Sequence, residues 1–115
     1  MDIHIISRDE EKETIMIDVM HRINMAAEVA LSWKITRGGA AMYCETDCNS
    51  NTGKVIRLFD ELQEMYPSID IRASYSYSCR EEDGSAQWYT TEEMESVHNE
   101  DGTAYIKRNS RTDWY

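Results

Sequence analysis

The sequence contains few residues that break a chain or crosslink it. Its 115 residues include one proline, five glycines and three cysteines, and no Cys-x-x-Cys pair is present. A chain with 41% hydrophobic residues and so little proline and glycine is typical of a folded globular protein. An odd number of cysteines without a redox motif favours free thiols in a reducing compartment over a disulfide framework.

Long apolar runs and basic residues are also scarce. No apolar run is long enough to span a membrane, and the start Met1–His4 lacks the basic residues of a signal peptide, so we expect a soluble cytoplasmic protein. With 22 acidic and 12 basic residues the net charge is −10, which repels nucleic acids and anionic membranes. This charge suits a basic partner, such as a protein groove that holds DNA or RNA. Alternatively, it only keeps the protein soluble.

Motifs that carry catalysis are absent from the sequence. There is no Gly-x-Ser-x-Gly elbow, and the stretch Asn51–Lys54 before a predicted helix lacks the other residues of a phosphate-binding loop. A zinc site would need two ligand pairs at suitable spacing. The potential ligands are instead scattered: His4, His21, His98, Cys44, Cys48 and Cys79. We therefore expect no enzyme activity, no cofactor and no metal site.

The first quarter of the chain predicts a strand followed by a helix. Ile3 and Ile5 indicate a buried strand over residues 2–7, and Ser7 with Glu10 has the spacing of a helix capping box. A helical apolar stripe follows at Ile15, Met16, Val19, Met20 and Ile23. Alternate residues from Ile15 to Ile23 are also mostly apolar, so a strand over this stretch stays open as the alternative.

The middle of the chain predicts a hairpin, a helix and a long strand. Residues 30–37 alternate and precede Gly38-Gly39, a turn signal, so they pair with a second strand over 40–47. Residues 54–66 form the clearest helix, which ends before Pro67. Its apolar stripe is Val55, Leu58, Phe59, Leu62 and Tyr66. Residues 69–79 alternate strictly and predict a strand with one buried face.

The last third of the chain predicts extra strands. A short strand is expected over 86–91 and an edge strand over 104–108, while 92–98 fits a helical turn or a hairpin arm. Residues 109–115 are expected to form a polar, flexible tail ending in Trp114-Tyr115. The whole order predicts a single α+β domain over 1–115, ferredoxin-like (split βαβ), with two helices on one face of an antiparallel sheet and extra C-terminal strands.

Six aromatic residues fall on the predicted strands: Trp33, Tyr43, Tyr75, Tyr77, Trp88 and Tyr89. On such a sheet exposed aromatics can stack on RNA bases, but the basic glycine-containing strand motif of RNA-recognition domains is absent. Two interpretations are left: an aromatic core beneath the helices or, where the rings are exposed, a protein-binding patch.

The segment from Trp33 to Tyr89 resembles the ferredoxin-like domain of the YubB-type proteins of plasmids and phages. The matching features are the strand ending Cys44–Asp47, the loop to Lys54, the helix with Leu58, Leu62 and Met65-Tyr66-Pro67, and the strand Ile69–Tyr77. The Trp-Ser-Pro-Pro element of that family is replaced by Cys48–Asn51. The resemblance implies a ferredoxin-like fold and a mobile-element origin, and it assigns no catalytic residue.

These features lead to one functional hypothesis and one main alternative. The first is a small non-enzymatic protein-binding module of phage or mobile-element origin that inhibits a host nucleic-acid-binding defence protein stoichiometrically, in the manner of anti-CRISPR and antirestriction DNA mimics. The predicted contact residues are Glu81, Glu82, Asp83, Trp88, Tyr89, Glu92, Glu93, Glu95, Glu100 and Asp101. The alternative is a structural domain that forms homo-oligomers through open sheet edges. A third possibility, an enzyme or ligand sensor, requires a concave pocket.

Overall fold

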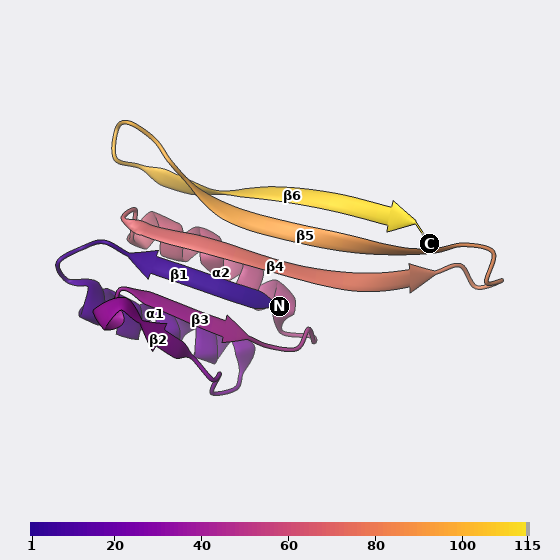
Figure 1. Ribbon diagram of the computed structural model, residues 1–115, viewed down its shortest axis with the longest axis horizontal. Helices are drawn as coiled ribbons and strands as arrows, with labels where there is room; N and C mark the ends of the chain where they lie inside the picture. The colour runs from indigo at the N-terminus through magenta and orange to yellow at the C-terminus, as the bar shows by residue number, and fades with distance from the viewer. Residues whose placement is uncertain (115) are drawn as a thin grey trace.

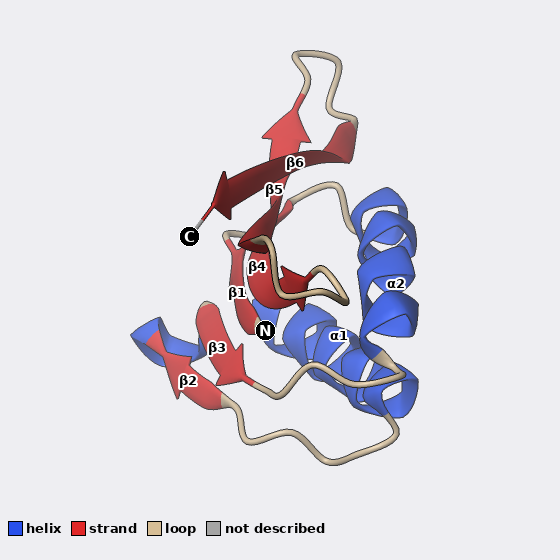
Figure 2. Cartoon of the chain, turned by 90° about the vertical axis from the view of Figure 1, so that its right-hand side faces the viewer, coloured by secondary structure: helices blue, strands red, loops and turns tan. Residues whose placement is uncertain are grey.

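Six strands form one sheet, and two helices cover one of its faces (Figures 1 and 2). The computed structural model describes residues 1–114, apart from the side chain of Arg37. In chain order the elements are β1 (Asp2–Ser7), α1 (Lys12–Ala27), β2 (Lys34–Thr36), β3 (Ala41–Glu45), α2 (Thr52–Met65), β4 (Ile69–Arg80), β5 (Gln87–His98) and β6 (Ala104–Trp114). A short 3-10 turn, Arg37–Gly39, joins β2 to β3.

The strand order is β2-β3-β1-β4-β5-β6, and every neighbouring pair is antiparallel. The prediction of an α+β fold with two helices beside an antiparallel sheet is confirmed. The sheet has six strands because β5 and β6 continue it beyond β4. Within residues 1–114, no helix combines the length and the apolar character needed to cross a membrane.

The hydrophobic core lies between the sheet and the two helices. Ile3 and Ile5 of the central strand β1 are completely buried, with β3 on one side and β4 on the other. The helices contribute residues such as Val19 and Phe59 to the same cluster. Burial of one such side chain stabilises the fold by about 1.5–3 kcal/mol, so this layer fixes the helices against β1, β3 and β4.

The helix α1 begins later than the capping-box spacing predicts. Ser7 is buried as the last residue of β1, and its hydroxyl accepts a hydrogen bond from the Asp9 N–H at 3.4 Å. The Asp9 carboxylate accepts one from the Glu11 N–H at 2.9 Å, and the helix begins at Lys12 without a side-chain cap. The capping-box prediction is wrong because Ser7 belongs to the strand and only shapes the connecting turn.

The strand alternative for residues 15–23 is also wrong. Val19 and Ile23 are completely buried, whereas Ile17 is 68% exposed on the opposite side of α1. This is helical periodicity, and a strand would have buried Ile17 with its alternate neighbours.

The first strand of the predicted hairpin is much shorter than expected. Leu31 and Trp33 lie in a loop before β2, where the Leu31 N–H and the Trp33 indole N–H both donate to Asn24 Oδ1, at 3.3 and 3.0 Å. Their alternation reflects packing of this loop against α1. Only Lys34–Thr36 pairs with β3.

The C-terminal strands are longer than predicted. β5 runs without interruption from Gln87 to His98, so the stretch 92–98 is a hairpin arm. β6 pairs with β5 from Ala104 to Trp114, so residues 109–114 form a strand rather than a flexible tail. The hydrophobic alternation of residues 109–114 is weak because most of their side chains are exposed, whichever face of the sheet they lie on. The remaining tail residue, Tyr115, lies outside the described residues.

Candidate functional site

The strands β4, β5 and β6 extend past the helices as a three-stranded projection (Figure 1). We define the arm as residues 75–92 and 110–114. Along β4 the side chains that face the helices are buried at Ile69, Ile71 and Ala73, and they become partly or fully exposed from Tyr75 onward. The change occurs because no helix covers the far part of the sheet. The arm contributes to a longest dimension of 55 Å for the whole chain.

The face of the arm on the helix side of the sheet is aromatic. Tyr75 and Tyr77 of β4 stack with ring centroids 6.1 Å apart. Trp88 of β5 pairs with Trp114 of β6, and their ring centroids lie 5.2 Å apart at an angle of 47°. Tyr77 is 45% exposed and Trp114 is 68% exposed. Exposed aromatic side chains gathered on one face are common anchors of protein interfaces.

The aromatic-core interpretation holds only in part: of the six aromatic residues, Trp33 and Tyr75 pack against the core, and none is fully buried. Among residues 1–114 the one aromatic side chain that is fully buried is Phe59, on α2. Tyr75 sits at the boundary: it packs against the edge of the core, and this burial, with the nearby Glu92 carboxylate as a second cause, raises its pKa. Tyr77 and Trp88 stay outside the core because neither helix extends over the arm.

The tip of the arm is acidic. Glu81, Glu82 and Asp83 are exposed in the loop that joins β4 to β5. The Glu81 N–H donates to the carbonyl of Ala86 at 3.0 Å, and Asp83 accepts a hydrogen bond from the Ser85 N–H at 2.8 Å. The contact with Ser85 lowers the pKa of Asp83, so this carboxylate stays ionised at neutral pH.

The other predicted contact residues are divided among three places. Glu92 is half-buried on the aromatic face and accepts a hydrogen bond from the Ser110 hydroxyl at 2.9 Å. Tyr89, Glu93 and Glu95 occupy positions of β5 that face the open side of the sheet. Glu100 and Asp101 lie in the turn between β5 and β6.

The structure therefore brings the tip, Trp88 and Glu92 together on the arm and separates them from Glu100 and Asp101. The tip and the β5–β6 turn lie at opposite ends of β5 (Figure 1), which has 12 residues. At about 3.3 Å per residue this strand is roughly 40 Å long. The sequence groups all of these residues in the C-terminal third, but adjacency along an extended strand is not adjacency in space.

None of the eight predicted contact carboxylates forms an ion pair within residues 1–114. The ion pairs found there involve other side chains: Arg22–Asp18, Lys54–Glu28, His98–Asp70, Arg108–Asp60 and Arg111–Asp113. Among the described residues, the carboxylates at the tip therefore have no ion-pair partner, whereas Glu95 of β5 lies between Arg72 and Lys107 in the neighbouring strands.

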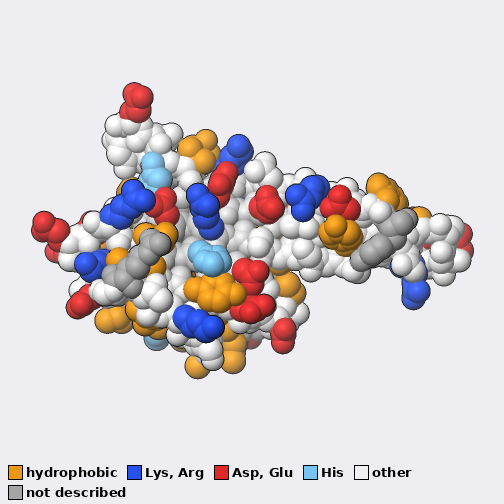
Figure 3. Space-filling view, viewed as in Figure 1, with side chains coloured by type: hydrophobic (Ala, Val, Ile, Leu, Met, Phe, Trp, Pro, Cys, Tyr) orange, Lys and Arg blue, Asp and Glu red, His pale blue; other side chains and the backbone are white. Residues whose placement is uncertain are grey.

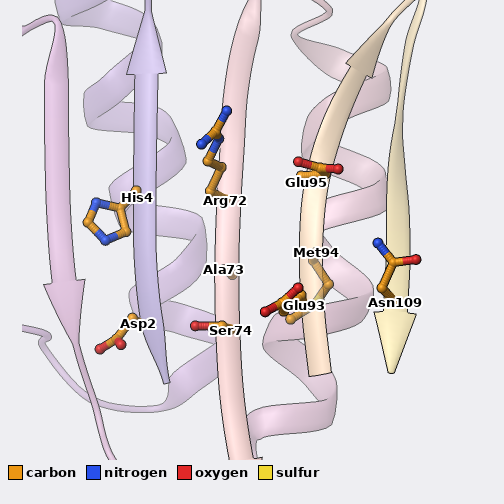
Figure 4. Close-up of a pocket in the computed structure, with 9 residues that line it drawn as sticks. All are labelled: Asp2, His4, Arg72, Ala73, Ser74, Glu93, Met94, Glu95 and Asn109. Atoms are coloured by element: carbon orange, nitrogen blue, oxygen red, sulfur yellow. The ribbon is translucent and has the colours of Figure 1, made fainter. Parts of the chain in front are cut away.

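A polar hollow of about 290 Å³ lies on the open face of the sheet (Figure 4). Its charged lining comes from three strands: Asp2 and His4 of β1, Arg72 of β4, and Glu93 and Glu95 of β5. Basic and acidic side chains alternate over this face (Figure 3), so it lacks a single dominant charge. Sequence reasoning missed the hollow because its titratable residues occupy outward-facing positions of separate strands, and only the strand pairing places them together.

The open-face hollow is lined mainly by polar and titratable side chains. The His4 ring packs against Tyr43, with centroids 4.5 Å apart. Among residues 1–114, no three His, Cys, Asp or Glu side chains are grouped so that they could hold a metal ion. The polar side chains that line the hollow can donate and accept hydrogen bonds to a partner or a small ligand.

Comparison with known proteins gives no match: no family model, no curated protein and no solved structure matches the chain. The resemblance of residues 33–89 to YubB-type proteins stays a prediction.

Proposed function

We propose that the chain is a non-enzymatic protein-binding module that uses its arm to contact a basic surface of another protein. The observation that carries the proposal is the arm itself, where exposed aromatic rings lie beside carboxylates that have no ion-pair partner within residues 1–114. Aromatic side chains provide contact area at a small entropic cost, and unpaired charges around them favour a partner of opposite charge.

The two kinds of residue have different roles in this proposal. Trp88 and Tyr77 would be covered by the partner and would supply most of the binding free energy. Glu81, Glu82 and Asp83 at the tip would attract the partner and orient it, and this effect is weakened by salt. Glu93, Glu95, Glu100 and Asp101 face elsewhere and would add long-range attraction without direct contact.

The more specific proposal is that the partner is a nucleic-acid-binding protein of host defence, such as a CRISPR or restriction component, which the chain inhibits stoichiometrically. Such proteins contain basic grooves that hold phosphate backbones, and a net charge of −10 favours association with them. Because the arm has only three strands, spaced at about 4.8 Å, it is narrow, and a narrow projection can enter a groove.

The fold allows a matching proposal about architecture. We propose that β1 to β4 with α1 and α2 form a ferredoxin-like core to which the β5–β6 hairpin is added. In support, these four strands are ordered β2-β3-β1-β4, α1 connects β1 to β2, and α2 connects β3 to β4. The added hairpin and the overlong β4 then create the arm, the part that we assign to binding.

The first experiment is capture of host proteins with the tagged chain at low and at high salt, followed by 1:1 titration of any purified partner. The arm variant carries Glu81→Gln, Glu82→Gln and Asp83→Asn. The control variant carries three exposed substitutions with the same charge change away from the arm, two in the turn before α1 and one on α2: Glu10→Gln, Glu11→Gln and Glu64→Gln.

We expect the arm variant to bind at least about tenfold more weakly, and the control variant to bind like the wild type. Equal weakening in both variants would mean that only net charge matters, and unchanged binding in both would remove the tip from the interface. Displacement of DNA or RNA from the partner tests the inhibitor proposal, and a partner that keeps its nucleic acid contradicts it.

A further inference from the structure

The strand β6 leaves one long edge of the sheet open. It has 11 residues, whereas β2 at the opposite edge has three. β6 pairs with β5 in one uninterrupted register from Ala104 to Trp114, without a bulge, and it contains no proline. A regular edge strand of this length presents alternating N–H and C=O groups to a further strand.

We propose that a second copy of this chain pairs with β6, antiparallel to it, in a register centred on Ser110. A two-fold axis perpendicular to the sheet keeps each side chain on its own face. Residues paired across the axis must lie on the same face of the sheet, and alternate residues of a strand face opposite sides. The axis therefore passes beside one residue, which lies opposite the same residue of the second copy. This restriction leaves few registers to compare.

Charge disfavours the registers centred on residues 108, 109 and 111. Centring on Arg108 or on Arg111 places two copies of the same guanidinium opposite each other. Centring on Asn109 places Lys107 opposite Arg111 of the second copy, and symmetry repeats this contact. Like charges directly opposite in an antiparallel pair are destabilising.

Centring on Ser110 gives complementary pairs on both faces. Lys107 then lies opposite Asp113 of the second copy, on the open face, and Ile106 lies opposite Trp114 on the helix side. Both contacts occur twice. Trp114 is 68% exposed in the single chain, and Ile106, at 9% exposure, marks the margin of the core. The pairing would therefore extend the core toward the exposed indole.

The basic residues of β6 do not obstruct this edge. The Arg108 guanidinium is held by Asp60 of α2, at 2.8 Å, and by the carbonyl of Ile56 at 3.1 Å. Arg111 contacts Asp113 of the same chain at 3.3 Å. Lys107 has no ion-pair partner within residues 1–114, and the proposed dimer supplies one.

Sedimentation velocity over a concentration series tests the dimer and its charge pairs. We expect a reversible dimer whose dissociation constant rises at least about tenfold in Lys107→Glu, because two attractive pairs become repulsive. The double variant Lys107→Glu with Asp113→Lys restores opposite charges and should return the constant toward the wild-type value. A wild-type chain that stays monomeric up to several hundred micromolar overturns the proposal.

Disulfide trapping tests the register. In a background of Cys48→Ser and Cys79→Ser, Ser110→Cys places two thiols on facing residues, with Cα atoms about 4.5–5.5 Å apart, within the range of a disulfide. In the control Thr112→Cys, the two cysteines at position 112 lie four residues apart along the paired strands, roughly 13 Å. Oxidation should crosslink the Ser110 variant alone. Equal crosslinking of both variants, or crosslinking of the control alone, overturns the register. The tip variants leave β6 unchanged, so this test is independent of the proposed function.

Discussion

The substitution Gln63→Leu should destabilise the protein strongly, although Gln63 is polar. The residue lies on α2 and is only 1% exposed. Its amide donates to the carbonyls of Tyr66 and Ile69, at 3.2 and 3.0 Å, and its carbonyl oxygen accepts a hydrogen bond from the Ser96 hydroxyl. Gln63 thus ties α2 to the first residue of β4 and to β5. Leucine has a similar volume but supplies none of these contacts.

The magnitude follows from the number of bonds lost. Each buried polar group left without a partner costs about 1–3 kcal/mol, and leucine recovers part of this through apolar burial, so we expect a loss of about 3 kcal/mol. With a urea m-value of roughly 1.5 kcal/mol per molar, the unfolding midpoint should fall by about 2 M. Equilibrium urea unfolding followed by circular dichroism measures this shift.

The partner residue provides the control. Ser96→Ala removes one of the bonds to Gln63, together with the acceptor of the Ile71 N–H, and should cost about 1–2 kcal/mol. Because the two side chains share a bond, the double variant should lose less than the sum of the single losses. A loss below about 1 kcal/mol for Gln63→Leu, or strictly additive losses, would refute the proposed network.

Two further predictions concern side chains away from the arm. Tyr66 donates a hydrogen bond of 2.5 Å to Asp18 and thereby lowers the pKa of Asp18 from its ordinary value of 3.8. The hydrogen bond stabilises the fold above pH 3.8, and this stabilisation is lost as the pH falls through the pKa of Asp18 in the folded state. In urea unfolding, Tyr66→Phe should therefore cost about 1 kcal/mol at pH 7 and progressively less below about pH 4. A difference in stability that does not depend on pH would contradict a role for Asp18. Burial raises the pKa of the Cys44 thiol, whereas Cys48 is exposed. Ellman's reagent should therefore modify Cys48 rapidly and Cys44 only on unfolding, and rapid loss of both thiols in the folded protein would contradict the burial.

Sequence periodicity predicted those elements that pack against the core. The helix over 52–65 and the strand from Ile69 were predicted within a few residues, because one face of each is buried and the other is wet. The stretch 109–114 was missed for the opposite reason. Its strand is held by pairing with β5 while most of its side chains are exposed, so it carries little hydrophobic pattern.

The candidate site was only partly accessible from the sequence. The acidic tip and Trp88 were found because carboxylates and aromatics are unusual enough to notice in a short stretch. Tyr75 and Tyr77 were noticed, but whether they form a core or a surface depends on how far the helices extend over the sheet. Trp114 was placed in a tail because its cross-strand partner, Trp88, lies 26 positions earlier in the chain.

The sequence by itself determined the net charge, the absence of catalytic motifs, the two helices and the alternating strands, since these depend on composition and on neighbours a few residues apart. Only the tertiary structure showed that β4, β5 and β6 extend beyond the helices and that β6 is an open edge of the sheet. It also showed that Glu100 and Asp101 lie far from the tip. Each of these is a matter of strand pairing between distant segments. Strand pairing is made by backbone hydrogen bonds, which every residue except proline can both donate and accept. The identity of the side chains therefore gives little information about which strands pair.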